Sequence, residues 1–428
     1  MARIGVFCFA GAGHLYPMTA LARRMQRRGH ELVFFGIADT EEKIRAAGLE
    51  FVQIGASDHP LGSLAAEDRK LAELRGLKTF AYTVERVKNT ARMVMRDGPR
   101  ACREAEVEAL LVDEADMGGN VAEHLRVPYI SVALFPPLIA DDRIPPFCFA
   151  WPAGQNAVSQ FRNRIGMRLL SRIAAPILRL VNAQRRTWGL HTLERATDLL
   201  SPLAQIAQLP RALEFDVPGL PTILHYTGPF VDRGARAAVD FPWKRLDGRP
   251  LVYASLGTLQ NGSQENFRIL AEGCAGLEAQ LVISLGGGLD PEQVGRLRGD
   301  PVIVRYAPQL DLLQRAAAVI THAGLNTTLE SLAEGLPLVC IPLGNDQPGV
   351  AARVVAKGAG VAIPRRKLTA ARVRAAARTV LEDRRYRTAA QRLQTAMATV
   401  DGPELAADII ENALRIETPI HVRKHAAG

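Results

Sequence analysis

Two widely separated stretches of this chain share one pattern: a short apolar run ends in a glycine turn and is followed by an amphipathic segment. In the first half, residues 4–10 are largely apolar, Gly11 and Gly13 form the turn, and apolar side chains of residues 15–25 recur at helical spacing. In the second half, residues 250–256 predict a strand that closes at a glycine. Strands that alternate with helices favour parallel sheets covered on both faces. The sequence therefore predicts an α/β protein with two doubly wound, Rossmann-like domains facing each other across a cleft.

Length and linker composition set the expected domain boundaries. A chain of 428 residues is long for one hydrophobic core, so two domains are expected. Residues 218–250 are rich in proline and glycine and poor in strand-like runs, which predicts a linker. We expect an N-terminal domain over residues 1–230, a C-terminal domain over 231–405, and a tail over 406–428 that packs back on the N-terminal domain.

Charge and cysteine content narrow the class of protein. The formal net charge is +9, but the basic residues are scattered and no zinc-finger or aromatic–basic RNA motif accompanies them, so nucleic acid is not an expected partner. Anionic small molecules and anionic membrane surfaces fit the charge better. Five cysteines without a CxxC spacing predict reduced thiols in a cytoplasmic protein, with no metal site. The first apolar run is interpreted as a strand rather than a secretory signal, and no apolar stretch of about 18 residues predicts a membrane span.

A basic amphipathic segment interrupts the strand–helix rhythm at residues 161–188, where seven arginines are interspersed with leucine, isoleucine and methionine. Two interpretations remain open. The segment can pack on its own domain and leave a solvated basic face, which is the simpler interpretation, or it can lie on an anionic membrane.

The motif at residues 321–331 carries the strongest chemical signal. An apolar strand runs into a loop with His322 and Gly324, and a helix with an apolar stripe of leucines and Ala333 follows. Free N–H groups and the positive dipole end at a helix start suit a diphosphate, and the histidine can donate to a phosphate oxygen. A structural explanation exists too, because Thr327 and Glu330 fit a capping box.

Three further strand ends present polar groups toward the same expected cleft. Asp346 and Gln347 follow the strand at 338–341, and vicinal sugar hydroxyls are good partners for such a pair. Tyr306, Ala307 and Gln309 end another strand and suit recognition of a base. Ser255, Gly257 and Thr258 offer hydroxyl and backbone donors from the facing strand end.

This succession resembles the donor-binding signature of UDP-dependent glycosyltransferases with the GT-B fold, the family of plant and bacterial natural-product glucosyltransferases. Residues 201–206, 254–260 and 346–351 are most similar to the bacterial zeaxanthin glucosyltransferase branch, and the similarity spans essentially the whole chain. It implies an N-terminal domain that binds the acceptor and a C-terminal domain that binds a UDP-sugar.

The resemblance also implies roles for the phosphate-facing residues. His322 would contact the α-phosphate, Asn326 and Thr327 would hold the diphosphate, and Thr258 would face the phosphates.

The remaining donor contacts are implied in the same way. Glu330 would take the ribose hydroxyls, and Asp346 and Gln347 would bind the sugar. Tyr306 stands where many members have a uracil-stacking tryptophan, and Leu325 replaces another common tryptophan. No prosthetic group is implied, and UDP-glucose is the default donor.

Residues 11–17 resemble the family's G-H-x-x-P stretch, in which the residue matching His14 is the catalytic base and Gly13 precedes it. An imidazole suits this role, because its ordinary pKa of about 6.5 allows it to take a hydroxyl proton near neutrality. A carboxylate on its far nitrogen would fix the tautomer. Asp113, at a strand end, is the candidate, with Asp116 as the alternative. These residues predict an inverting, metal-independent O-glycosyl transfer.

Parts of the sequence are also compatible with other functions. A nicotinamide or flavin oxidoreductase would need a third glycine where Tyr16 stands and an acid after the second strand, which ends Phe34-Phe35-Gly36-Ile37. A nucleotide-sugar epimerase or a non-catalytic lipid- or glycan-binding protein remain alternatives. The expected acceptor is a lipophilic alcohol such as a carotenoid, another terpenoid, a polyketide or a flavonoid. Its wall is expected from the first half of the chain, including Phe135, Pro136, Pro137, Ile144 and Phe147, and from the basic segment 161–188.

Overall fold

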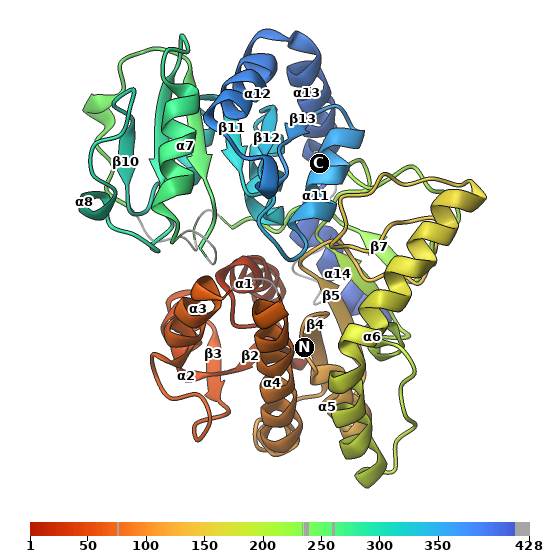
Figure 1. Ribbon diagram of the computed structural model, residues 1–428. Helices are drawn as coiled ribbons and strands as arrows, with labels where there is room; N and C mark the ends of the chain where they lie inside the picture. Colours follow the sequence, from red (N-terminus) through yellow and green to blue (C-terminus); the bar gives the residue numbers. More distant parts are fainter. Residues whose placement is uncertain (75–76, 233, 235–238, 259–261, 416–428) are drawn as a thin grey trace, which may run out of the picture.

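The computed structural model describes residues 1–74, 77–232, 234, 239–258 and 262–415, and it contains two parallel α/β sheets (Figure 1). The first sheet has the order β3-β2-β1-β4-β5-β6-β7. Its strands are β1 (Arg3–Phe7), β2 (Glu31–Gly36), β3 (Glu50–Gln53), β4 (Ala109–Asp113), β5 (Tyr129–Ala133), β6 (Gln205–Ala207) and β7 (Leu224–Tyr226). The helices of this half are α1 (Ala12–Arg27), α2 (Ala38–Ala46), α3 (Ser63–Glu73), α4 (Leu77–Glu104), α5 (Gly118–Leu125) and α6 (Ala157–Thr187).

The second sheet repeats this topology with the order β10-β9-β8-β11-β12-β13. Its strands are β8 (Leu251–Ser255), β9 (Gln280–Ser284), β10 (Val302–Val304), β11 (Ala316–Thr321), β12 (Leu338–Cys340) and β13 (Gly360–Ala362). The helices are α7 (Gln264–Cys274), α8 (Pro291–Val294), α9 (Gln309–Leu313), α10 (Leu325–Ala333), α11 (Gln347–Ala356), α12 (Ala370–Glu382), α13 (Arg384–Ala398) and α14 (Gly402–Leu414). The predicted fold class is confirmed.

The order of the strands positions the functional region. In each sheet the first three strands are added toward one edge and the later strands toward the other, so the strand order reverses at β1/β4 and at β8/β11. The helices that follow these strands go to opposite faces, so a crevice opens at the carboxyl ends. The two central pairs are buried on both faces, as expected for parallel strands rich in valine, leucine and isoleucine. The two crevices face each other across the gap between the domains (Figure 1).

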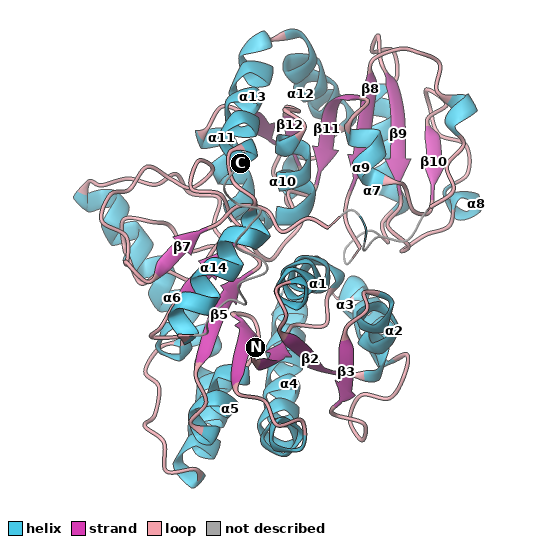
Figure 2. Ribbon diagram, turned by 180° about the vertical axis from the view of Figure 1, so that it is seen from behind, coloured by secondary structure: helices cyan, strands magenta, loops and turns pink. Residues whose placement is uncertain are grey.

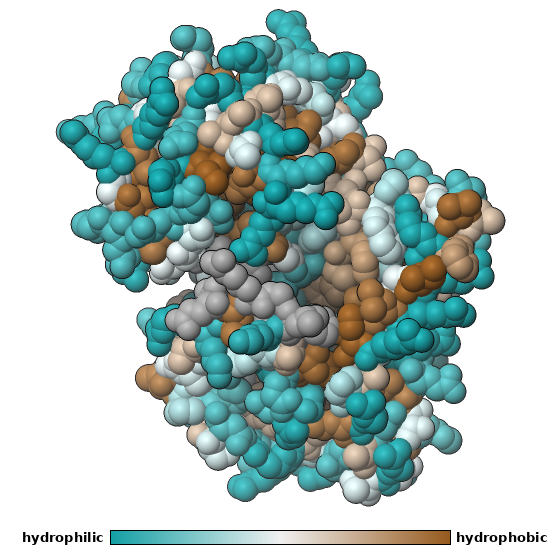
Figure 3. All heavy atoms as spheres, viewed as in Figure 1, coloured by the Kyte–Doolittle hydropathy of each residue, from teal (hydrophilic) through white to brown (hydrophobic). Residues whose placement is uncertain are grey.

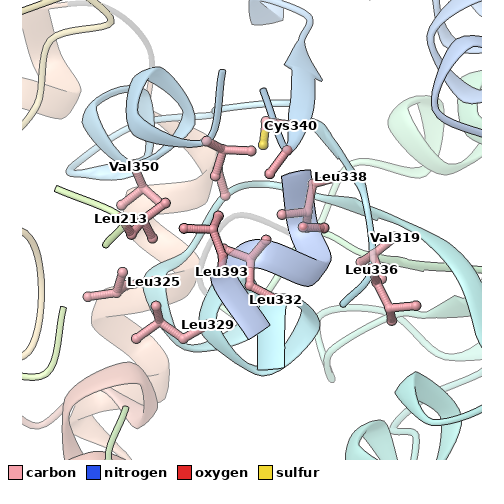
Figure 4. Packing of buried hydrophobic residues seen from close by; sticks show 14 of the residues in the cluster. Leu213, Val319, Leu325, Leu329, Leu332, Leu336, Leu338, Cys340, Val350 and Leu393 are labelled. Atoms are coloured by element: carbon pink, nitrogen blue, oxygen red, sulfur yellow. The ribbon is translucent and has the colours of Figure 1, made fainter. Parts of the chain in front are cut away.

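One hydrophobic cluster joins the two domains on the side of α11. Leu213 and Phe215, from the loop after β6, belong to the same buried cluster as Leu325 and Val350 of the C-terminal domain. Figure 4 shows Leu213 among these C-terminal side chains. The two lobes therefore bury apolar surface together on this side.

Helix α14 packs on α1, although the two helices are far apart in the sequence (Figure 2). Ala406, Ala407 and Ile410 of α14 belong to the hydrophobic core of the first sheet. Arg28, at the end of α1, donates to both carboxylate oxygens of Glu411, at 2.8 and 2.7 Å, and also pairs with Glu404 and Asp408. Of the predicted tail over 406–428, residues 406–415 are described; the tail's expected start falls inside α14, and residues 416–428 lie outside the described residues.

The structure corrects several local expectations. The segment 218–250 is not only a linker, because β7 lies within it and forms an edge of the first sheet. Leu329 and Leu332 of the predicted stripe in α10 are buried, whereas Ala333 is exposed. The five cysteines are free thiols, as predicted. Among the described residues, no helix is long and apolar enough to cross a membrane.

Candidate active site

A cleft of about 2040 Å³ lies between the carboxyl ends of the two sheets, and both domains line it. This volume exceeds the 300–1,000 Å³ typical of a site for one small ligand, so two substrates can occupy it together. Every predicted site residue lies on its wall: Gly13, His14, Asp113, Ser255, Gly257, Thr258, Tyr306, Ala307, Gln309, His322, Gly324, Asn326, Thr327, Glu330, Asp346 and Gln347. Of the predicted acceptor wall, Phe135, Pro137, Ile144 and Phe147 line the cleft, whereas Pro136 does not.

His14 and Asp113 meet at the carboxyl edge of the first sheet. His14 lies in the first turn of α1 and Asp113 ends β4, and the Nδ1 atom of the imidazole is 2.7 Å from Oδ2 of the carboxylate. Asp113 is fully buried, and its oxygens also accept from the backbone N–H groups of Phe9 and Ala115. Because Nδ1 is engaged, Nε2 is the nitrogen left to face the cleft, and among the described residues it has no hydrogen-bond partner.

The alternative carboxylate does not reach the imidazole. Oδ1 of Asp116 accepts from the backbone N–H groups of Met117 and Gly118, at the start of α5. Glu114, between the two aspartates, accepts from Leu138 N and from Gln205 Nε2, and burial raises its pKa to about 8. Glu114 therefore fixes the loop after β5. Among the described residues, no group of three or more His, Cys, Asp or Glu side chains could hold a metal ion.

Two opposing effects set the proton affinity of His14. Burial lowers its pKa, but the charge of Asp113, its hydrogen bond to Nδ1 and the more distant charge of Asp346 outweigh burial, so the pKa lies above 6.5. A base acts in its neutral form, so kcat/KM should rise with pH and level off above this raised pKa.

Replacing Asp113 by asparagine should move that rise to lower pH, because burial then acts on the imidazole without a compensating charge. The plateau of kcat/KM should also fall, by roughly 10²- to 10⁴-fold, since the forming imidazolium loses its partner and the tautomer is no longer fixed. A pH–rate profile measures both effects. Asp116→Asn is the matched control and should keep the wild-type profile; the reverse outcome would make Asp116 the partner.

The start of α10, where the sequence predicts a diphosphate, lines the cleft on the side of the C-terminal domain. Gly324 is the N-cap residue and no side chain caps the helix, so the predicted capping box of Thr327 and Glu330 is wrong. The N–H groups of the first turn therefore remain available for a ligand with negative charge. The His322 ring lies against Gly257 and Gly324, and burial lowers its pKa to about 4. A neutral imidazole at this position offers one N–H donor rather than a positive charge.

Gly257 leaves the space that the His322 ring occupies. Its φ is +78°, and a Cβ there would lie 2.6 Å from Nε2 of His322. Gly257→Ala should raise the KM for the nucleotide donor by about ten-fold or more, because it displaces a donor to a charged ligand. Gly276→Ala is the control, since it has a similar φ of +79° with no atom within 4 Å of a Cβ. Equal donor KM values for the two variants would contradict this role of the ring.

A hydrogen-bonded chain of side chains runs along the cleft wall from β8 to α10. Tyr253 Oη donates to Gln309 Oε1 at 3.0 Å, and Gln309 Nε2 donates to Glu330 Oε2 at 2.6 Å. Tyr306 lies on the cleft wall with its hydroxyl against the backbone of Gly287, where any Cβ would overlap it. Tyr253 and the glycine loop 286–288 were missed by the sequence analysis, although the three successive glycines after a predicted strand are a usable signal.

Asp346 and Gln347, the pair predicted to bind the sugar, differ in how their side chains are engaged. Asp346 is the N-cap residue of α11, with no side-chain cap; burial raises its pKa, while the charges of His14 and Arg353 act to lower it. Oε1 of Gln347 accepts from the backbone N–H groups of Leu343 and Gly344, at 2.7 and 3.0 Å. The carboxylate and the Gln347 amide nitrogen are thus the groups that can meet ligand hydroxyls.

Asn326 connects the two halves of the site. Its Nδ2 donates to the Gly13 carbonyl at 2.8 Å, and its Oδ1 accepts from Gln208 Nε2 at 3.0 Å. The side chain predicted to hold a diphosphate therefore binds the N-terminal domain, next to His14. Gln208, buried at the end of β6, was missed because nothing in its sequence surroundings indicates a partner 118 residues away.

Comparison with known proteins agrees with this geometry. The chain is 30% identical to a zeaxanthin glucosyltransferase of Pseudescherichia vulneris, over 94% of this chain and 95% of that one. The chain belongs to the UDP-glucoronosyl and UDP-glucosyl transferase family. The sequence model of that family matches residues 246–427. A zeaxanthin glucosyltransferase of Pantoea ananas is 29% identical over 95% of both chains. The solved structure of the glycotransferase of kitacinnamycin superposes with a TM-score of 0.74 at 23% identity, covering 96% of this chain and 98% of that one.

Membership of the UDP-glucoronosyl and UDP-glucosyl transferase family makes the protein a glycosyltransferase that uses a nucleotide-sugar donor. The family match covers α10 and the strand ends around it. The predicted resemblance is confirmed.

Proposed function

We propose that the protein transfers a hexose, with UDP-glucose as the donor, to a hydroxyl group of a lipophilic alcohol, with inversion at the anomeric carbon. The observation that carries the proposal is the 2.7 Å contact between His14 and Asp113 on the wall of the cleft that α10 also lines. A base with a positioned carboxylate and a helix start that favours a diphosphate lie within one cavity large enough for both substrates.

In the proposed donor complex, the diphosphate lies at the start of α10 and accepts from the neutral His322. The uracil ring lies against Tyr306, and the ribose hydroxyls hydrogen-bond to Glu330. Asp346 and Gln347 take the sugar hydroxyls. Negative charge that develops on the leaving diphosphate is stabilised by fixed N–H donors in a partly enclosed site, where such interactions are strong.

In the proposed chemical step, Nε2 of His14 takes the acceptor's hydroxyl proton. The oxygen attacks the anomeric carbon from the face opposite UDP, a new C–O bond forms, and the bond to the diphosphate breaks. Asp113 stabilises the imidazolium. The scheme balances with UDP as the leaving group and requires no metal ion.

The acceptor class follows from the N-terminal wall of the cleft, which is mainly apolar. The lining includes Phe135, Ile139, Ile144, Phe147, Met167, Leu170, Ile173 and Ile177. Together with the similarity to zeaxanthin glucosyltransferases, this wall supports a hydroxylated carotenoid as the acceptor. Since such alcohols dissolve in lipid, we also propose that the protein works in peripheral contact with an anionic membrane.

A mass-spectrometric screen tests the proposal. UDP-sugars are incubated with detergent-dispersed zeaxanthin and with smaller terpenoid, polyketide and flavonoid alcohols, and a hexose adduct with release of UDP is expected. Conversion of the donor sugar without an acceptor would instead support an epimerase. Binding of UDP without hydrolysis or transfer for any pair would support a non-catalytic binding protein.

A further inference from the structure

Helix α6 has one face packed into the protein. Asn163 is buried and donates from Nδ2 to the Asp142 carbonyl at 2.8 Å. One turn further on, Gly166 is buried so closely that a Cβ would lie 2.8 Å from the Trp151 ring. Met167 and Leu170, near the same side of the helix, line the cleft. These contacts fix the rotation of α6, so its opposite side is directed away from the protein.

The opposite side of the N-terminal half of α6 is apolar and exposed. Val158, Phe161, Ile165 and Leu169 are 79%, 59%, 49% and 49% exposed. Their spacing of three and four residues places them on one helical stripe. In Figure 3 apolar side chains lie over the position of α6, in a band that runs from the upper right inward to the middle of the molecule. A contiguous apolar stripe of this kind indicates an interaction surface.

A row of exposed arginines runs beside the stripe. Arg164, Arg168 and Arg172 are spaced by four residues, and Arg179 follows two turns later. Arg164, which pairs with Asp142 at 3.1 Å, and Arg168 also line the cleft. Arg172 and Arg179 do not line the cleft, and no acidic side chain within the described part of the chain forms an ion pair with them. We call the stripe together with Arg172 and Arg179 the α6 outer face.

We propose that the α6 outer face docks on an anionic phospholipid bilayer, with the four apolar side chains in the headgroup region and Arg172 and Arg179 on lipid phosphates. Apolar side chains combined with cations on one helical face are what such a surface binds. A second copy of this chain fits less well, because a two-fold contact through the stripe would bring two rows of arginines together.

The position of α6 gives this docking a consequence for the substrate, and this part rests on the proposed function. The outer face meets the bilayer while the other side of the same helix, with Met167, Leu170 and Ile173, lines the acceptor wall. A lipid-dissolved alcohol can thus pass along α6 into the cleft without crossing bulk water.

Vesicle flotation of the purified protein tests the docking, with no donor or acceptor present. The wild type should float with vesicles of phosphatidylcholine and phosphatidylglycerol, and weakly with phosphatidylcholine alone. Arg172→Glu with Arg179→Glu should lower the partition coefficient on the order of 25-fold, at about five-fold per arginine. Phe161→Ser with Ile165→Ser and Leu169→Ser should lower it by about ten-fold or more. Arg372→Glu with Arg384→Glu makes the same charge change on exposed residues of α12 and α13 and should float like the wild type.

Three outcomes would overturn the proposal: no flotation of the wild type with anionic vesicles, an equal loss in the control variant, or a dimer that the triple serine variant converts to a monomer. A second readout compares detergent-dispersed and vesicle-embedded acceptor, and the outer-face variants should lose transfer only with the latter. A protein that floats but transfers no sugar would refute the proposed function alone, and one that transfers but does not float would refute the docking alone.

Discussion

His14→Ala is expected to lower kcat/KM for glycosyl transfer by about 10³-fold, within the 10²- to 10⁴-fold range of general-base catalysis. The imidazole is the only basic group paired with Asp113 among the described residues, and its removal leaves the acceptor hydroxyl without a proton acceptor. The start of α10, His322 and Tyr306 are untouched by the change, so the affinity for UDP should stay within about two-fold of the wild type.

Steady-state assays of transfer and calorimetric titration with UDP measure the two quantities separately. His191→Ala, which removes an exposed histidine, is the control and should retain full activity. The double variant His14→Ala with Asp113→Asn should have the same kcat/KM as His14→Ala alone, because the carboxylate acts through the imidazole. Parallel loss of UDP binding and transfer would show that His14 supports the structure of the cleft instead.

The largest effect on stability is expected from Arg353→Ala, at about 3–5 kcal/mol of unfolding free energy. Arg353, in α11, and Glu214, in the loop after β6, are both fully buried, with contacts of 2.8 and 3.1 Å. Glu214 also accepts from Phe215 N and Tyr226 Oη. Removing the guanidinium leaves a buried carboxylate uncompensated between the two domains.

Denaturant unfolding measures this effect, and the same helix offers a matched control. Lys357, one turn after Arg353, contacts Asp216 at 2.8 Å across the same pair of domains, but Asp216 is exposed. Lys357→Ala should therefore lower the free energy of unfolding by less than about 1 kcal/mol. Arg353→Met combined with Glu214→Leu should recover part of the loss, since no charge is then left unpaired. If Arg353→Ala and Lys357→Ala lower the free energy of unfolding equally, burial does not set the strength of the ion pair between Arg353 and Glu214.

The fold could be predicted from the sequence because the strand and helix patterns are local and occur repeatedly. The run before Gly11 is a strand with α1 directly after its glycine turn, and the run before Gly257 is a strand with α7 beginning at Gln264; the parallel topology follows from this alternation. β7 escaped prediction because its three residues, Leu224–Tyr226, form no continuous apolar run and lie in a stretch rich in proline and glycine, so it was assigned to a linker.

In the candidate site, too, some residues could be predicted from the sequence and others could not. Asp113 could be assigned to His14 because strand ends of a parallel sheet meet at one edge, even for residues 99 apart in the chain. Gln208 and Tyr253 could not be predicted as part of the site, because their roles come from contacts made only after the domains meet or the helices dock. The capping-box interpretation of α10 failed because Gly324, rather than a later residue, begins the helix.

The docking of α14 on α1 has a consequence for the order in which the protein matures. Arg28 follows the last residue of α1, the helix whose first turn holds His14, and its buried partner Glu411 is 383 residues downstream. Leu15, Met18 and Leu21 of α1 lie in one buried cluster with Ala406, Ala407 and Ile410 of α14. Part of the core of the first lobe is therefore supplied by residues synthesised long after its own strands, so this lobe can complete its packing only once α14 has left the ribosome.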